Sequence, residues 1–176
     1  VDCEAMGKEI EGLIRTGRSA DGLMISDRAN IVLPYHRAFD GAEERVRGSK
    51  GVGTTGRGIG PCYSDKIARS GIRMGDLLDE SYLRERLDTI LPMKERLAES
   101  LGEPLGIDRE ELIKKLLGYG RTYRNRIVDT SVLIHGSIKA GKKVMFEGAQ
   151  GTMLDIDNGT YPNVTSSNST SAAICT

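Results

Sequence analysis

A run rich in glycine, residues 48–60, is the feature that most limits how this chain can fold. Glycine adopts backbone conformations that other residues avoid, so a run with glycine at nearly every second position favours a loop. The segment before it has apolar residues at helical spacing: Tyr35, Phe39, Ala42 and Val46. Pro34 suits the first turn of that helix, and a short helix is expected after the loop, at about 62–70. We therefore predict a helix–loop–helix unit whose loop is long enough to carry a binding site.

The same part of the chain is strongly basic. Between Arg45 and Arg73 there are seven basic residues and one acid, Asp65, which gives a local charge of +6. The whole chain is neutral, with 25 Lys and Arg against 25 Asp and Glu. Lys66 and Arg69 lie three residues apart and are expected to face the same way on the second helix. Because glycine loops and helix N-termini bind anions, we predict a phosphate or carboxylate site, with a solvated basic face as the alternative.

Two familiar phosphate-binding patterns fit the loop only in part. Gly51, Gly53 and Gly56 satisfy G-x-G-x-x-G, but a helical segment precedes them where that motif requires a strand. A Walker A pattern also begins at Gly51. It fails at Arg57 and Gly58, where Lys and then Ser or Thr are required. Neither name applies, although the physical basis for an anion site remains.

The rest of the chain is predicted to be mainly helical. The first segment with a regular pattern is a helix capped by Asp2, and the next is two short strands or a hairpin at 23–25 and 29–33. A long helical region follows at about 80–138, broken at Pro92 and at 102–106. Asp108 has capping-box spacing to Glu111, and Gly141 is typical of a helix end. Residues 143–146 then have the pattern of a buried strand.

A second polar loop follows that predicted strand, at a position where open α/β sheets bind ligands. The amide of Gln150 both donates and accepts hydrogen bonds, which suits the edge of a base. Asp155 and Asp157 could exchange protons, bind a cation or cap turns. Residues 165–170 offer hydroxyls and amides that bind phosphate without adding charge, although such a run is more often an ordinary loop.

The remaining chemistry-bearing residues point to no metal site. The three cysteines, Cys3, Cys62 and Cys175, are far apart and predict neither a disulfide framework nor a metal centre. A reducing, cytoplasmic location is therefore expected. His36 follows the start of a predicted helix, where a capping or packing role is expected rather than a catalytic one. No apolar run approaches the roughly 20 residues of a membrane helix, so no membrane partner is expected.

Two long motifs give the chain a resemblance to a known family. The first motif reads Gly58-Ile59-Gly60-Pro61-x-Tyr63-x-x-Lys66-x-x-Arg69 and is preceded by Gly53-Thr54-Thr55-Gly56-Arg57. The second runs from Phe146-Glu147-Gly148-Ala149-Gln150-Gly151-Thr152 through Asp155-Ile156-Asp157 to Val164-Thr165-Ser166-Ser167-Asn168. In this order they resemble the signatures of adenylosuccinate synthetase.

The resemblance implies an α/β fold, with the chain as a partial segment of a P-loop-like enzyme. Residues 1–176 would form that single segment, with a mostly helical middle and a few short strands. The helical insertion would cover about 60–140. The loops of an inosine monophosphate (IMP) site would cover about 48–70 and 147–170.

The family is a C–N bond-forming ligase of purine nucleotide synthesis, which joins IMP and L-aspartate with GTP as cosubstrate and Mg²⁺ as cofactor. GTP first phosphorylates the 6-oxygen of IMP, and aspartate then displaces that phosphate. The resemblance implies that Thr55 and Thr165 contact the 5′-phosphate of IMP and that Gln150 binds near the reacting base. Arg69 would reach the IMP phosphate of the neighbouring subunit of a homodimer. Lys66 and Gln150 are the implied catalytic residues.

Parts of the family pattern are absent from this sequence. The phosphate loop Gln-Trp-Gly-Asp-Glu-Gly-Lys-Gly is missing, as are the aspartate-binding loop and the Lys-x-Asp guanine reader. We therefore expect an internal segment that is inactive alone, with most GTP and Mg²⁺ ligands elsewhere. The alternative is a non-catalytic nucleotide-phosphate-binding or dimerisation module. A nucleic-acid binder is disfavoured because the net charge is zero.

Overall fold

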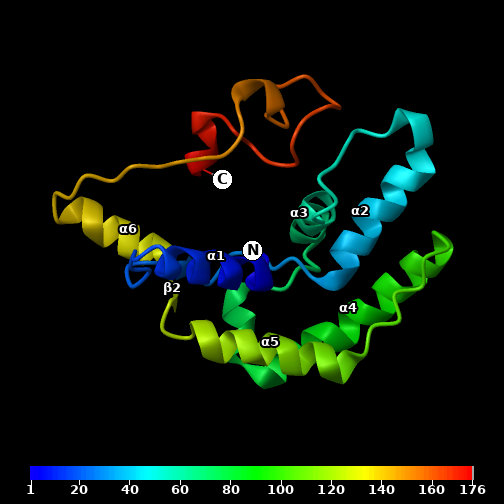
Figure 1. The fold of residues 1–176 in the computed structure, drawn as a ribbon, viewed down its shortest axis with the longest axis horizontal. Helices are drawn as coiled ribbons and strands as arrows, with labels where there is room; N and C mark the ends of the chain where they lie inside the picture. The colour runs from blue at the N-terminus through cyan, green and yellow to red at the C-terminus, as the bar shows by residue number, and fades with distance from the viewer. Residues whose placement is uncertain (176) are drawn as a thin grey trace.

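Helices make up most of the fold (Figure 1). The computed structural model describes residues 1–175. The α-helices are α1 (Cys3–Arg15), α2 (Pro34–Arg47), α3 (Ile59–Ala68), α4 (Glu80–Ser100), α5 (Arg109–Tyr123) and α6 (Thr130–Lys139). The 3-10 turns are η1 (Gly48–Lys50), η2 (Met74–Leu78), η3 (Thr152–Leu154) and η4 (Ser171–Cys175). Within residues 1–175 no helix has the length and apolar character needed to cross a bilayer.

Several helix ends lie where the sequence predicts them. Asp2 caps α1 by accepting hydrogen bonds from the backbone N–H groups of residues 4 and 5, each at 3.1 Å. Asp108 accepts from the N–H of Glu111 at 2.9 Å and caps α5. Pro34 begins α2, and Gly141, with φ of 71°, follows the end of α6. Because each signal acts through neighbouring residues, these predictions are confirmed.

The predicted break at Pro92 is wrong. Helix α4 continues through Pro92 and ends at Ser100. Proline removes one N–H from the helix ladder, but Leu87 and Ile90 are buried just before it and hold the helix against the core. The second predicted break is confirmed, since α4 and α5 are separated by residues 101–108.

The predicted hairpin is also wrong. Strand β1 (Ile25–Ser26) pairs in parallel with β2 (Ile127–Val128), with Ile25 opposite Ile127. Asn30, in the second expected strand, forms an isolated antiparallel bridge with Arg73. The partners thus come from distant parts of the chain, which local alternation cannot reveal. The mostly helical middle with short strands is confirmed.

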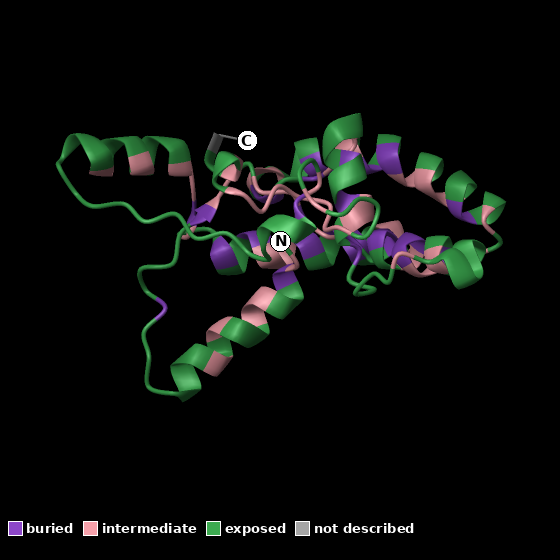
Figure 2. Ribbon diagram, turned by 90° about the horizontal axis from the view of Figure 1, so that it is seen from above, coloured by how far each residue is buried: buried purple, intermediate pink, exposed green. Residues whose placement is uncertain are grey.

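Residues 143–146 do not form the predicted buried strand. They are irregular and exposed, and Met145 is 84% exposed. An apolar run becomes a strand only when another strand pairs with its backbone. Within residues 1–175 no strand pairs with residues 143–146. Figure 2 shows α6 and the extended segment after it almost wholly exposed.

The core lies where η2 packs against α4 and α5. Its fully buried side chains include Ile72, Met74, Leu83, Leu87 and Ile113. Helices α2 and α3 pack against each other beside this core, and Ile31 and Leu33 lead into α2 from within it. This arrangement fixes the positions of both helices that flank the glycine-rich run.

Two glycines of α5 allow a test of this packing. A Cβ at Gly120 would overlap the carbonyl oxygen of Leu77 in η2, whereas one at Gly118 has no neighbour closer than 3.9 Å. Gly120→Ala should therefore lower the free energy of unfolding by about 1–3 kcal/mol. Gly118→Ala should raise it by up to about 1 kcal/mol, since alanine favours helix. Urea unfolding measures both, and equal effects of the two variants would contradict this packing.

Candidate anion-binding site

A buried carboxylate joins the two helices around the glycine-rich run. Asp65 on α3 accepts hydrogen bonds from the hydroxyl of Tyr35 and from Nε2 of His36, both at 3.0 Å. Lys94 of α4 forms an ion pair with the other oxygen of Asp65. Burial raises the pKa of Asp65, but the hydrogen bonds from His36, Lys94 and Tyr35 outweigh it and hold this pKa well below its usual range. The carboxylate is therefore ionised and fully paired.

His36 is a structural histidine in this network. Its Nδ1 accepts a hydrogen bond from the backbone N–H of Leu33 at 2.8 Å, so Nε2 carries the proton that is donated to Asp65. Burial lowers the pKa of His36 more strongly than Asp65 raises it. The expectation of a capping or packing histidine is confirmed.

Helix α3 begins at a glycine that no other residue could replace without displacement. Gly58 has φ of 77°, and a Cβ there would come within 2.8 Å of the backbone of His36 and Arg37 in α2. Its N–H donates to Asp40 of α2 at 2.8 Å. Because Gly58 bears no side chain, it cannot cap α3, and within residues 1–175 the first N–H groups of this helix lack intrahelical partners.

The glycine-rich loop, residues 51–58, turns several N–H groups towards α2. The N–H groups of Val52 and Gly53 donate to the carboxylate of Glu44, each at 3.1 Å. The N–H of Gly56 donates to Thr54 at 3.3 Å. Acceptors of the protein itself therefore already occupy these N–H groups of the loop. The side chains of Thr55 and of Ile59, the first residue of α3, are exposed.

The second loop, residues 147–170, meets the start of α3. A Cβ at Gly60 would lie 3.2 Å from the hydroxyl oxygen of Ser166, so little space separates the two segments. Figure 1 shows this loop, in orange, beside α3. The hydroxyl of Ser166 thus lies next to a helix N-terminus, where an anion is favoured.

Asp155 organises the second loop. It is 0% exposed, and its two oxygens accept the backbone N–H groups of Asp157, Asn158, Ser169 and Thr170 at 2.7–3.1 Å. Burial raises its pKa, but these backbone donors lower it by more. Of the roles left open for Asp155, the structure shows turn capping.

A cationic groove of about 280 Å³ lies at the other end of α3. Its basic residues are Lys66, Arg69, Arg73 and Arg86. Arg86 donates to the carbonyl oxygens of Arg69 at 3.0 Å and Gly71 at 3.2 Å, which fixes the turn after α3. Asp76 is the acid in this groove, and burial raises its pKa. Lys66 also lies 5.6 Å from the ring centre of Tyr63.

The predicted site residues fall into separate places. Lys66 and Arg69 line the same groove. Thr55 is exposed on the glycine-rich loop, and Thr165 is half-buried in the second loop, where its N–H donates to Leu154 at 2.9 Å. Gln150 is exposed, with a left-handed φ of 64°. Among residues 1–175, no group of three or more His, Cys, Asp or Glu side chains is placed to hold a metal ion.

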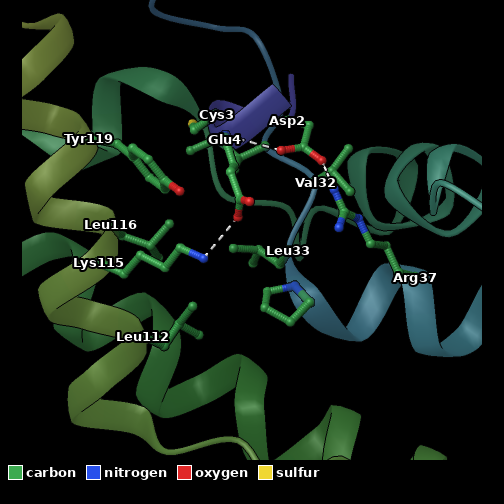
Figure 3. A pocket seen from close by; sticks show the side chains of 12 residues that line it. Asp2, Cys3, Glu4, Val32, Leu33, Arg37, Leu112, Lys115, Leu116 and Tyr119 are labelled. Atoms are coloured by element: carbon green, nitrogen blue, oxygen red, sulfur yellow. Dashed lines mark hydrogen bonds and ion pairs between the residues drawn. The ribbon is translucent and has the colours of Figure 1, made fainter. Parts of the chain in front are cut away.

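Sequence reasoning misses one cavity, of about 300 Å³, between the start of α1, Pro34 and α5. Figure 3 shows its charged side chains in pairs: Glu4 points to Lys115, at 3.2 Å, and Asp2 to Arg37. These pairs neutralise each other across helices. The ion pairs at the wall of the cavity therefore connect α1 with α2 and with α5, and they leave none of these four charged side chains unpaired.

Comparison with known proteins decides the family. A family model described as adenylosuccinate synthetase matches residues 1–176. This chain belongs to the adenylosuccinate synthetase family. It is 48% identical to the adenylosuccinate synthetase of Prochlorococcus marinus (strain MIT 9211), with 99% of this chain covered. It is 46% identical to that of Clostridium acetobutylicum, again over 99% of this chain.

A solved structure agrees with these synthetase relatives. The structure of fully ligated adenylosuccinate synthetase from Plasmodium falciparum has a TM-score of 0.85 to this chain and is 33% identical to it. The match covers 98% of this chain and 40% of that one. The chain spans about 40% of the length of the curated synthetases that it matches.

The two histidines of the chain allow a test of the buried network. The pKa of His36 is lowered from 6.5, so stability is full above that pH and falls as pH decreases below it. Stability from this network falls again below pH 3.8, because the pKa of Asp65 is also lowered. His36 can change the free energy of unfolding by at most about 1.4 kcal/mol per pH unit.

His36→Gln should remove the dependence between about pH 6.5 and the lowered pKa of His36. His135→Gln, at the exposed histidine of α6, should leave it in place. Urea unfolding over a pH series measures the difference. An unchanged slope in His36→Gln would show that this histidine does not report the buried network.

Proposed function

We propose that this chain is part of an adenylosuccinate synthetase, in which it supplies half of the IMP site and part of a homodimer interface. The whole enzyme would join IMP and L-aspartate, with GTP as the phosphate donor, in the cytoplasm. Residues 1–176 would form one partial segment, with IMP-site loops at about 48–70 and 147–170. The chain alone would be inactive.

The observation that carries this proposal is the contact between the two loops at the start of α3. Ser166 of the second loop lies against Gly60, next to the uncapped N-terminus of α3. A helix N-terminus favours a phosphate group. Thr55, from the glycine-rich loop, and Thr165, one residue before Ser166, would bind the 5′-phosphate of IMP there.

The remaining residues would act on the base and across the dimer. The exposed amide of Gln150 would hydrogen-bond near the 6-oxygen of IMP and orient it for phosphorylation. Arg69 is exposed at the edge of the cationic groove and would reach the phosphate of IMP in the neighbouring subunit. Lys66, beside it, would support the same contact.

In the proposed reaction the 6-oxygen of IMP attacks the terminal phosphate of GTP and releases GDP. The amine of aspartate then attacks carbon 6 of the base, the bond from that carbon to the phosphorylated oxygen breaks, and inorganic phosphate leaves. The residues of this chain would bind and orient IMP in both steps. Residues 1–175 hold no cluster suited to a metal ion, so no step is assigned to Mg²⁺ through this chain.

The alternative is a nucleotide-phosphate-binding or dimerisation module without chemistry. The cationic groove favours it, because Lys66, Arg69 and Arg73 form no ion pair within residues 1–175. The alternative predicts IMP binding with no turnover in any context.

A chimaera separates the two functions. In the Clostridium acetobutylicum synthetase, which is 46% identical, this chain replaces the matching segment. We expect the chimaera to form adenylosuccinate from IMP, aspartate and GTP, because the missing parts of the site are restored. Folded chimaera that binds IMP but makes no product would favour the non-catalytic module.

Two substitutions in the chimaera test residue roles. Arg69→Leu removes a charged hydrogen-bond donor and should weaken IMP binding about 10- to 100-fold. Arg124→Leu, at an exposed arginine after α5, is the control and should leave IMP binding unchanged. Gln150→Ala should lower kcat more than it weakens IMP binding. Steady-state kinetics measures kcat, and calorimetry measures the affinity for IMP. If Gln150→Ala lowered kcat and IMP affinity equally, Gln150 would have no specific role in the transition state.

A further inference from the structure

Two carboxylates of α2 hold both ends of the glycine-rich loop. Glu44 accepts the N–H groups of Val52 and Gly53, each at 3.1 Å, at the beginning of the loop. Asp40 accepts the N–H of Gly58 at 2.8 Å, at its end. Asp40 and Glu44 are four residues apart, so they lie on one face of the helix. A single rigid element thus holds the loop at two points.

In the middle of the loop, the described residues form only a local hydrogen bond, from the N–H of Gly56 to Thr54 at 3.3 Å. A Cβ at Gly53 or at Gly56 would have no neighbour within 4 Å among the described residues, so the space where a side chain would begin is open at both. Both have positive φ, at 74° and 66°. Thr55 lies between them and is exposed. The conformation that presents Thr55 therefore depends on the hydrogen bonds at the two ends of the loop.

The charges of these carboxylates are compatible with a nearby phosphate site. Asp40 is 5% exposed and faces the backbone of the loop. Glu44 also pairs with Arg47 at 3.3 Å. Burial raises the pKa of Glu44, but the N–H groups of Gly53 and Val52 and the Arg47 guanidinium lower it by more. Glu44 therefore remains an ionised acceptor at neutral pH.

We propose that Asp40 and Glu44 are positioning residues, which fix the glycine-rich loop so that Thr55 meets the phosphate of a bound nucleoside monophosphate. This inference rests on the proposed function. The two carboxylates do not touch the substrate. They act through the N–H groups at either end of the loop, which strengthens binding because the loop is ordered before the substrate arrives.

The test compares two neighbouring glutamates of α2 in the chimaera. Glu44→Ala removes both loop hydrogen bonds and should raise the KM for IMP about tenfold, the loss expected from one or two such bonds. Its kcat should change little, because the phosphate is remote from the reacting carbon and is held equally in ground and transition states. Glu43→Ala removes an exposed acid that pairs with the same Arg47 and should leave both constants unchanged.

Conservative variants and amide exchange separate positioning from folding. Glu44→Gln keeps an acceptor oxygen for the loop, so its KM for IMP should be lower than that of Glu44→Ala. Asp40→Asn keeps an acceptor oxygen for the N–H of Gly58, so its KM for IMP should stay close to that of the parent chimaera. Hydrogen exchange of the chain should speed up at Val52 and Gly53 in Glu44→Ala, while the core amides of α4 and α5 stay protected.

The outcomes distinguish this inference from the proposed function. An active chimaera whose KM for IMP is the same in Glu44→Ala and Glu43→Ala overturns the positioning role. An equal loss in kcat and in kcat/KM does so too. An inactive parent chimaera overturns the proposed function, and amide exchange then decides: unchanged exchange at residues 52 and 53 overturns the role of Glu44, and faster exchange supports it.

Discussion

The Asp65 carboxylate is the interaction on which the rest of this structure depends. A buried carboxylate is unfavourable unless donors surround it. Here the donors are Tyr35 and His36 from α2 and Lys94 from α4. Loss of one partner from such a buried pair costs about 3–5 kcal/mol, because the remaining charge is left uncompensated. The network therefore fixes three helices together, and α3 lies among them.

Fixing α3 also fixes both parts of the candidate site. The helix begins directly after Gly58 of the glycine-rich loop, the second loop lies against it at Gly60, and it ends just before Arg69 of the cationic groove. Asp65 faces inwards to its partners. Its negative charge therefore does not offset the basic residues that face outwards, and the groove keeps its preference for anions.

Local signals in the sequence are sufficient for the ends of the elements. Asp2, Pro34, Asp108 and Gly141 act on neighbouring backbone groups, so each can be recognised without knowledge of the fold. Pro92 shows the limit of such signals, since packing of α4 against the core overrides the missing N–H. The loops that carry the candidate site and the family could also be predicted, because both follow from consecutive residues.

Contacts between distant residues could not be predicted in this way. Glu44 and Val52, or Asp65 and Lys94, carry no sequence pattern that pairs them, and the parallel partner of Ile25 lies about a hundred residues away. The apolar run 143–146 shows the same limit, because a strand forms only where a partner is available. The sequence by itself determined the helices, the two loops and the family. The tertiary structure decided which N–H groups of the glycine-rich loop remain free for an anion, because hydrogen-bond partners are chosen by proximity in space.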